Sequence, residues 1–409
     1  MSSSSDASLE TPILDSEFES LLQRITEEGG YAFAAMAARA GGGDHRAAEA
    51  AREMAWEQLH SGPWNSVVPI WRDAYAVACL QVAKYHYASG EFKLALRALD
   101  MGLIMGGLTL REDLNLCIGK ASAALRGKEV SDNGGGLQKC DFYRDFNLAE
   151  VIKSLPLKSL SCNTVEKKSG LSLEAFLTEH FVSGSPVIIS DCMNHWPAKD
   201  RWNDMNYLER VAGFRTVPVE IGKNYLSSDW KQELLTFSEF LERMKFGNCY
   251  STSLTYLAQH QLFDQIQELK QDIVIPDYCY AGGGEIQSLN AWFGPPGTVT
   301  PLHHDPHHNI LAQVVGKKYI RLYPASLSEE LYPHSESMLS NSSQVDLDNI
   351  DEEQFPKIMD LEFVDCILEE GEMLYIPPKW WHYVRSLTPS FSVSFWWSES
   401  DQANSSHPS

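Results

Sequence analysis

The chain has 409 residues, 44% hydrophobic and 22% charged, which is enough for two or three globular domains. Its 33 Lys and Arg against 55 Asp and Glu give a formal net charge of −22. A surface this acidic repels phosphate backbones and attracts cationic peptides, so direct nucleic-acid binding is disfavoured. The longest apolar run, residues 101–110, is too short for a membrane span, and the N-terminus lacks the features of a secretory signal. Eight scattered cysteines without metal-site spacing are expected to be reduced thiols in the cytosol or nucleus.

Residues 15–126 are predicted to form an all-α helical domain, and the Ser- and acid-rich residues 1–14 before it are expected to be disordered. Apolar residues recur there at three- and four-residue spacing, as between Trp71 and Val82. Residues 85–106 have a Gly-centred turn between two amphipathic segments, which is typical of a tetratricopeptide-type (TPR-like) hairpin. A plain helical bundle is the alternative, and either would offer a docking or dimerisation surface.

A mainly β domain is predicted after a polar, Gly-rich linker at residues 127–137. It covers residues 138–398, and residues 399–409 are expected to be a disordered tail. Many short strands, with helices before and between them, favour a double-stranded β-helix, the jelly roll of the cupin kind, with flanking helices. The best strands are residues 186–190, 216–222, 288–294, 310–324, 372–377 and 391–397, and the best helices are residues 172–181 and 237–246.

A histidine-rich run in this domain contains the clearest chemical motif. In an extended chain, positions i and i+2 share a face, so His303 and Asp305 can both point inward while His304 points away. Pro306 supports this, because it disfavours helix at the residue before it. His382, which follows a predicted strand, is the best candidate for a third ligand. Two histidines and one carboxylate suit Fe(II) and leave open the coordination positions that an oxygenase needs.

Two other interpretations of the same run stay open. It could be a solvent-exposed loop, or His304 and His308 could bind zinc at helical spacing. Pro306 between these two histidines weakens the helical version.

Lys318 is a candidate anion-binding residue. In its predicted strand it shares a face with Ile320 and Leu322, which points it toward a core. A buried ammonium without an anionic partner costs several kcal/mol, and no carboxylate is obvious on neighbouring strands. A bound dicarboxylic acid would supply the missing charge. The alternative is that Lys318 reaches along the barrel wall to a solvated rim.

Two further strands carry polar and aromatic residues on one face. Ser392, Ser394 and Trp396 alternate with apolar residues, which suits a strand lining a polar cavity with Trp396 closing one wall. A half-solvated strand is the alternative. Asn290 and Trp292 share one side of an earlier strand and form a similar pair.

From about residue 171 to residue 398 the sequence resembles the JmjC domain of Fe(II)/2-oxoglutarate oxygenases. The segments YLAQHQLFDQI, NAWFGPPGTVTPLHHDPHHN, GKKYIRLYP, WWHYVRSL and FSVSFWW are similar to the JmjC domain-containing protein 5 branch, in its plant form. The N-terminal helices match that branch only in general character. The resemblance implies that His303, Asp305 and His382 hold the iron and that Lys318 binds the far carboxylate of 2-oxoglutarate. Its other candidate contacts to this cosubstrate are Tyr256, Thr300, where a serine is common, Asn309, Trp396, Asn290 and Trp292.

The resemblance also implies a reaction class, in which 2-oxoglutarate and O2 are consumed while a protein side chain is oxidised. Members of the branch are described both as demethylases of methyl-lysine in histone H3 and as protein arginyl hydroxylases, and the sequence leaves both open. The implied partner is a basic protein or peptide such as a histone tail. The implied setting is the nucleus, with the cytoplasm as a second compartment, and roles in chromatin, transcription and biological rhythms. Two alternatives are a catalytically silent JmjC-like interaction module that uses its helical domain as a scaffold, and a zinc cupin with hydrolase or isomerase chemistry.

Overall fold

The computed structural model describes residues 8–130, 148–161, 163–246, 254–336 and 338–399, and the chain divides into two compact units. The helical unit comprises residues 1–138 with residues 214–216, and the barrel unit comprises residues 139–213 and 217–409. None of the described helices is long and apolar enough to cross a bilayer. The described cysteines that are free thiols are Cys79, Cys117, Cys192, Cys279 and Cys366.

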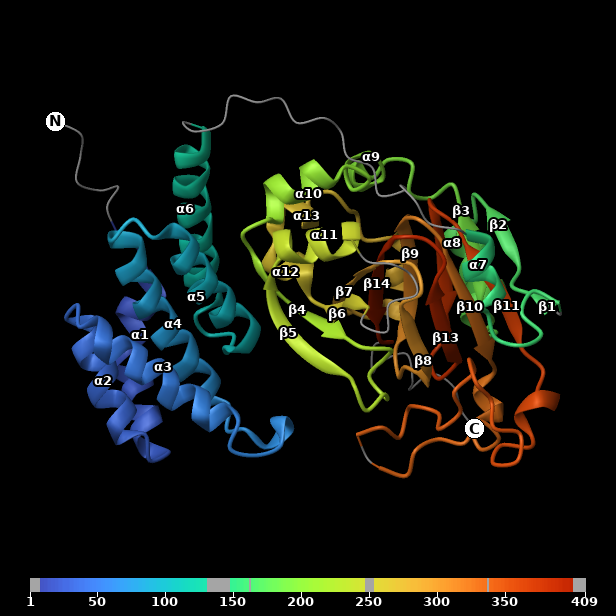
Figure 1. Ribbon diagram of the computed structural model, residues 1–409, viewed down its shortest axis with the longest axis horizontal. Helices are drawn as coiled ribbons and strands as arrows, with labels where there is room; N and C mark the ends of the chain where they lie inside the picture. The colour runs from blue at the N-terminus through green and yellow to red at the C-terminus, as the bar shows by residue number, and fades with distance from the viewer. Residues whose placement is uncertain (1–7, 131–147, 162, 247–253, 337, 400–409) are drawn as a thin grey trace. The chain divides into compact units, whose positions relative to one another are not determined.

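Six α-helices and one 3₁₀ turn make up the described part of the helical unit (Figure 1). Helix α4 is buried over most of its length and packs against α3 and α5. Its residues Ala74, Ala76 and Ala78 are fully buried, so neighbouring helices can approach it closely on several sides. The elements are α1 (Pro12–Glu27), α2 (Tyr31–Gly41), α3 (His45–Leu59), η2 (Trp64–Ser66), α4 (Ile70–Ala88), α5 (Phe92–Met105) and α6 (Arg111–Val130).

The expected disorder of residues 1–14 is wrong for its second half. Helix α1 begins at Pro12, and Leu9 and Leu14 are buried. The backbone N–H groups of Ile13 and Leu14 donate to the Asp113 carboxylate at 3.2 and 2.7 Å, so a distant side chain satisfies the first helical turn. Residues 1–7 lie outside the described residues.

The predicted linker also begins later than expected. Helix α6 continues to Val130, so residues 127–130 are helical, and Gly127 lies within a helix. Residues 131–137 of the predicted linker and residues 400–409 of the predicted tail lie outside the described residues. Glu399 is described, and its carboxylate lies 3.4 Å from Nε2 of His308.

Two sheets form the barrel unit, as the predicted double-stranded β-helix requires. In the described residues the smaller sheet has the order β1 (Asn163–Thr164), β11 (Val364–Leu368), β10 (Lys318–Tyr323), β13 (Trp381–Ser386) and β8 (Val299–His304). The larger has the order β2 (Lys167–Ser169), β3 (Val187–Ser190), β12 (Glu372–Ile376), β9 (His308–Val315), β14 (Ser390–Trp397), β7 (Ile286–Gly294), β6 (Thr255–His260), β4 (Thr216–Ile221) and β5 (Lys231–Thr236).

The core between the two sheets is apolar. Ile320 and Leu322 of β10 pack there with Leu311 of β9 and Leu374 of β12, so inward residues of both sheets meet. Helices surround the sheets (Figure 1): α7 (Leu148–Lys153), α8 (Leu173–Phe176), the π-helical turn η3 (Leu177–Phe181), α9 (Pro197–Arg201), α10 (Met205–Ala212), α11 (Phe237–Phe246), α12 (Leu262–Gln265) and α13 (Gln267–Lys270). Short 3₁₀ turns are η4 (Asp277–Gly283), η5 (Ala325–Leu327) and η6 (Ile358–Asp360).

One predicted strand is divided in the structure. Residues 310–324 form β9 and β10, separated by Gly316 and Lys317. Gly316 has φ +78°, and a Cβ there would lie 2.0 Å from the carbonyl oxygen of Pro389, so only glycine fits this turn. The turn lets β10 leave the larger sheet and join the smaller one, which places Lys318 opposite the larger sheet.

Candidate metal centre and its cavity

His303, Asp305 and His382 lie together although β8 and β13 are far apart in the sequence. Strands β8 and β13 are antiparallel neighbours with His303 directly opposite His382, and Asp305 follows β8. Oδ2 of Asp305 lies 3.9 Å from Nε2 of His303 and 3.6 Å from Nε2 of His382. The two imidazole centroids are 4.1 Å apart. One ion can therefore contact all three side chains.

Backbone carbonyls set the orientation of both imidazoles. Nδ1 of His303 lies 2.8 Å from the Pro301 carbonyl oxygen, and Nδ1 of His382 lies 3.0 Å from that of Trp380. A carbonyl only accepts, so each Nδ1 carries the hydrogen and each Nε2 offers its lone pair toward Asp305. Burial, and then the neighbouring His303, lower the pKa of His382 to about 4. His382 is therefore a neutral ligand near pH 7, as metal binding requires.

The charge balance fits a divalent cation. Within the described residues, the ion-pair contacts of Asp305 are to these two histidines alone, with no Lys or Arg among them. A buried carboxylate with no Lys or Arg beside it lacks a fixed counter-charge, which a metal ion would supply. The cluster contains no fourth His, Cys, Asp or Glu in the described chain, so it offers a facial set with open positions rather than the extra glutamate of a zinc cupin.

The other histidines of the run take separate structural positions. The His304 ring packs edge-on against Trp381, with centroids 4.7 Å apart and planes at 73°. Nδ1 of His308 lies 2.9 Å from the Tyr375 hydroxyl. His304 ends strand β8 and His308 begins strand β9, so the two histidines are not at helical spacing. Both the zinc-pair and the solvent-loop interpretations of this run are therefore wrong.

A segment far along the chain holds the end of β8. The His304 N–H donates to the Asn341 carbonyl at 2.9 Å, and Nδ2 of Asn341 donates to the His304 carbonyl at 3.0 Å. The Ser343 N–H donates to the Leu302 carbonyl at 2.8 Å. Beyond the strand, the Lys379 N–H donates to the Asp305 carbonyl at 2.7 Å. These bonds fix the backbone on both sides of the ligand pair, and the sequence analysis missed them because they join distant segments.

The three ligands open onto a cavity between the sheets. Both sheets contribute to its walls, so the cavity lies inside the barrel. Its lining residues are Tyr256, Trp292, Thr300, His303, Asp305, Asn309, Leu311, Lys318, Ile376, His382 and Val384. All of these lining residues except Asp305 lie in strands, so the pairing of the sheets determines their positions.

Lys318 is the cation of this cavity. It is 1% exposed, so the alternative in which it reaches a solvated rim is wrong. Its Nζ donates to the Tyr256 hydroxyl at 3.3 Å and lies 5.7 and 6.0 Å from the ring centroids of Tyr256 and Trp292. In the described part of the chain no carboxylate pairs with it, and burial lowers the pKa of Lys318 to about 7.

The cavity also contains a polar side-chain atom without a hydrogen-bond partner. Oδ1 of Asn309 is buried and has no hydrogen-bond partner among the described residues. Burial raises the pKa of Tyr256, while a hydrogen bond with Thr300 opposes this shift. A dicarboxylic acid fits such a site, because it would bring an anion to Lys318 and polar atoms to the neighbouring amide and hydroxyl groups.

Two predicted cosubstrate contacts do not line the cavity. Trp396 pairs with Ser288 and Asn309 near the end of β14 and is not among the lining residues. Asn290 is buried, but its Nδ2 donates to Ser288 at 3.0 Å. The predicted faces are right, because neighbouring Ser394 accepts from Nε1 of Trp292 at 2.9 Å. Contact of Asn290 and Trp396 with the cosubstrate stays a prediction.

The apolar part of the lining was missed. Leu311 and Val384 follow Asn309 and His382 by two positions, so period-two alternation could have identified them. Ile376 has no such local signal, because β12 reaches the cavity only through its pairing with β9. The last strand is also not half-solvated: β14 is buried throughout except at Trp396.

A cupin-like barrel with a two-histidine, one-carboxylate centre defines the JmjC class of proteins. The family described as "Cupin-like domain" matches residues 173–403, and the family described as "KDM8-like, N-terminal ARM repeats" matches residues 11–135. The chain therefore belongs to the JmjC family, in the branch with KDM8-like ARM repeats. The predicted helical domain is confirmed, and its repeats are of the ARM type rather than the tetratricopeptide type.

Several relatives are similar over nearly the whole chain. "Lysine-specific demethylase JMJ30" of Arabidopsis thaliana is 63% identical, over 97% of this chain and 96% of its own length. "Lysine-specific demethylase 8" of Xenopus tropicalis is 38% identical, over 85% of this chain and 87% of its own. "Jumonji C domain-containing protein 5" of Drosophila melanogaster is 37% identical, over 84% of each chain. The chain thus falls in the plant part of this branch, as the resemblance implied.

Proposed function

We propose that this protein is an Fe(II)- and 2-oxoglutarate-dependent oxygenase that removes methyl groups from lysine in a basic protein tail such as that of histone H3. The main observation behind this proposal is that the His303, Asp305 and His382 set and an unpaired buried cation, Lys318, line the same cavity. When bound, the iron would couple O2 reduction to decarboxylation of 2-oxoglutarate and to oxidation of the substrate side chain.

The protein's own residues would hold and orient the reactants. His303, Asp305 and His382 would hold the metal on one face and leave the other face toward the cavity. Lys318 would pair with the far carboxylate of the diacid, while Tyr256 and Thr300 orient that end by hydrogen bonding. Trp292, Leu311 and Val384 would exclude water from the reacting groups.

Two observations support a methyl-lysine substrate. Relatives aligned over most of this chain have the printed name "lysine-specific demethylase". The net charge of −22 favours association with a cationic histone tail. Hydroxylation of arginine is the competing outcome, since the same metal centre serves both reactions. The nucleus is the compartment that a histone substrate requires.

Anaerobic titration tests the cofactor set. Adding Fe(II) and then 2-oxoglutarate to the protein without a histidine tag should produce a weak visible charge-transfer band. His303→Ala should abolish the band, and Lys318→Ala should shift its appearance to much higher 2-oxoglutarate concentrations. Lys317→Ala is the matched control, because Lys317 pairs with Glu369 at 2.7 Å on the surface. A wild-type protein without the band contradicts the proposal.

Mass spectrometry of methylated histone H3 peptides after aerobic turnover tests the substrate. Loss of a methyl group together with release of formaldehyde supports demethylation. An arginine that gains one oxygen would instead show that the protein is an arginyl hydroxylase. If wild type and His303→Ala act alike in cells and neither changes a peptide, the protein is a catalytically silent interaction module.

The helical unit is proposed to dock a protein partner. Trp64 and Leu108 of this unit expose 68% and 77% of their surface and are available for contact. Trp64→Ser with Leu108→Ser should weaken capture of a nuclear partner while leaving peptide turnover unchanged. Unchanged capture together with normal nuclear residence would contradict this role.

A further inference from the structure

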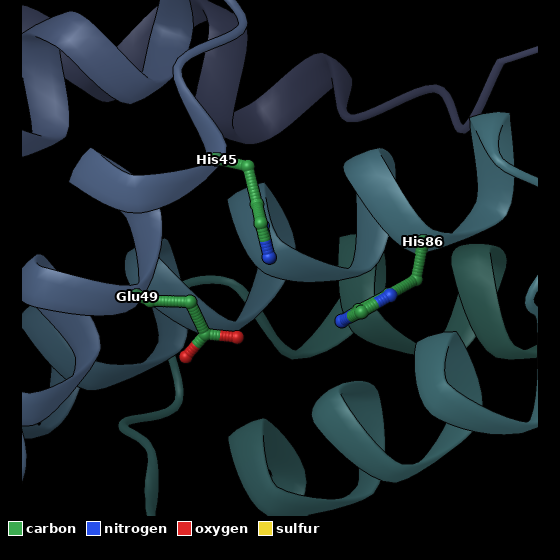
Figure 2. Close-up of side chains that lie close together, drawn as sticks. All are labelled: His45, Glu49 and His86. Atoms are coloured by element: carbon green, nitrogen blue, oxygen red, sulfur yellow. The ribbon is translucent and has the colours of Figure 1, made fainter.

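A second group of metal-ligand side chains lies in the helical unit, apart from the site described above. His45 and Glu49 of α3 and His86 of α4 place their ligand atoms within 4.8 Å of one another. Figure 2 shows the two ring tips and the carboxylate turned toward a common point. We propose that these three side chains bind a divalent transition-metal ion, zinc being the best match, and that the ion clamps α3 to the end of α4.

The start of α3 places two ligands on one face. Asp44 caps the helix, since its carboxylate accepts from the Ala47 N–H at 3.1 Å and also pairs with Arg39 at 2.7 Å. Helix therefore begins at His45, and positions i and i+4 of a helix lie one turn apart on the same side. His45 and Glu49 consequently point to the same neighbour, which is α4.

The end of α4 orients the third ligand. Gly90 has φ +73°, and the Glu91 N–H donates to the His86 carbonyl at 2.8 Å, which closes the helix and folds Glu91 back beside His86. Oε2 of Glu91 lies 2.7 Å from Nδ1 of His86. The carboxylate accepts the Nδ1 hydrogen, so Nε2 keeps a free lone pair. A carboxylate behind a histidine is the usual support of a metal-binding imidazole.

The His45 ring is also held in place. It stacks on Tyr85 with centroids 3.8 Å apart and planes at 10°, and it meets His86 edge-on at 5.3 Å. Its Nδ1 is buried and has no hydrogen-bond partner among the described residues. No protein group therefore fixes which ring nitrogen carries the hydrogen, and a metal ion can select either one.

An ordinary surface ion-pair network is the competing explanation. Glu49 pairs with Arg52 at 2.5 Å, and these side chains are 32% and 28% exposed. Such a pair contributes little free energy, so an ion held by two imidazoles and a carboxylate should displace it. Metal–ligand bonds of about 2.1 Å need ligand atoms roughly 3.4 Å apart, which small side-chain rotations from 4.8 Å can reach. The partial exposure leaves access for the ion and room for a water ligand.

Zinc stoichiometry tests the proposal on the full chain without a histidine tag. Equilibrium dialysis against zinc chloride, with elemental analysis, should give about two zinc ions per chain, because the barrel centre also accepts zinc. His86→Ala and Glu49→Gln should each leave about one, and so should His303→Ala with His382→Ala. Combining His86→Ala with the two barrel substitutions should leave none. Circular dichroism checks that each variant keeps its helices.

Matched controls separate a built site from a surface network. His60→Ala, in the same unit, should keep both ions, because Nδ1 of His60 contacts only the Trp56 carbonyl at 2.8 Å. Glu91→Gln should weaken the helical site about 10- to 100-fold without removing it. Arg52→Ala should tighten it several-fold by freeing Glu49. A folded His86→Ala variant that binds as many zinc ions as wild type overturns the proposal, and the variant with both barrel substitutions reports on the barrel centre separately.

Discussion

The barrel and the helical unit each bring two histidines and a carboxylate together, but by different backbone rules. In the barrel, His303 and Asp305 are two positions apart at a strand end, and His382 lies opposite on the paired strand. In the helical unit, His45 and Glu49 are four positions apart on α3. Period two and period 3.6 thus assemble the same ligand chemistry, and the third ligand comes in both cases from a packed neighbour.

The surroundings of the two clusters differ more than their ligands do. Main-chain carbonyls orient the barrel imidazoles, whereas the exposed Glu91 carboxylate orients His86. The barrel cluster opens onto a cavity with a buried cation, while Glu49 of the helical cluster pairs with Arg52 at a partly exposed surface. Two histidines and a carboxylate therefore suit a reaction in the barrel and the proposed clamp between helices in the helical unit.

The largest effect expected from this comparison is on turnover. His303→Ala should lower the rate of 2-oxoglutarate consumption by more than about 100-fold, since even changes behind a metal ligand cost about 10- to 100-fold. His86→Ala should leave the rate within about twofold, if the helical ion has no part in the reaction. His304→Ala is the control within the barrel and should keep most of the turnover, because the His304 ring packs against Trp381 and is not in the ligand set. An equal loss of turnover in the His86 and His303 variants would contradict the assignment of catalysis to the barrel cluster alone.

Lys318 should show opposite effects on binding and on stability. Lys318→Met removes the partner of the diacid, so 2-oxoglutarate binding should be lost. The same change removes an unpaired buried cation, so the free energy of unfolding of the ligand-free protein should rise by about 1–4 kcal/mol. Calorimetry and urea denaturation measure the two quantities. Lys317→Met should change neither, and a Lys318 variant that is destabilised would argue for a purely structural lysine.

Binding of 2-oxoglutarate should depend on pH above neutrality. The pKa of Lys318 is lowered to about 7 in the ligand-free fold, and an anion beside it should raise that pKa. Binding therefore takes up a proton above pH 7, and affinity should fall by up to about tenfold per pH unit as pH rises. Anaerobic calorimetry between pH 6.5 and 8.5 measures this slope. Lys318→Arg should flatten it, and an unchanged slope there would assign the titration to another group.

The smallest effect is expected at the end of the barrel. Trp396→Phe should leave 2-oxoglutarate affinity within about twofold, because Trp396 is not among the residues that line the cavity. Trp292→Phe should weaken it more, since Trp292 lines the wall beside Lys318. Calorimetry of both variants tests the order, and a larger loss at Trp396 would place the cosubstrate nearer the β14 end.

The sequence by itself determined which residues share a face. Strand alternation pointed His303 and Asp305 inward together and grouped Lys318 with Ile320 and Leu322, and the structure has the same groupings. Helical periodicity likewise identified the helical domain. These features depend on the local geometry of the backbone, so a few consecutive residues are sufficient to predict them.

Only the tertiary structure decided how far along the barrel each residue lies and which distant segments meet. It left Asn290 and Trp396 out of the cavity lining, and it set the beginning of α1 through the distant carboxylate of Asp113. It also brought His86 to His45, a pairing that no local pattern predicts. Depth, burial and third ligands follow from the pairing and packing of segments far apart in the chain, and residue periodicity carries no information about that register.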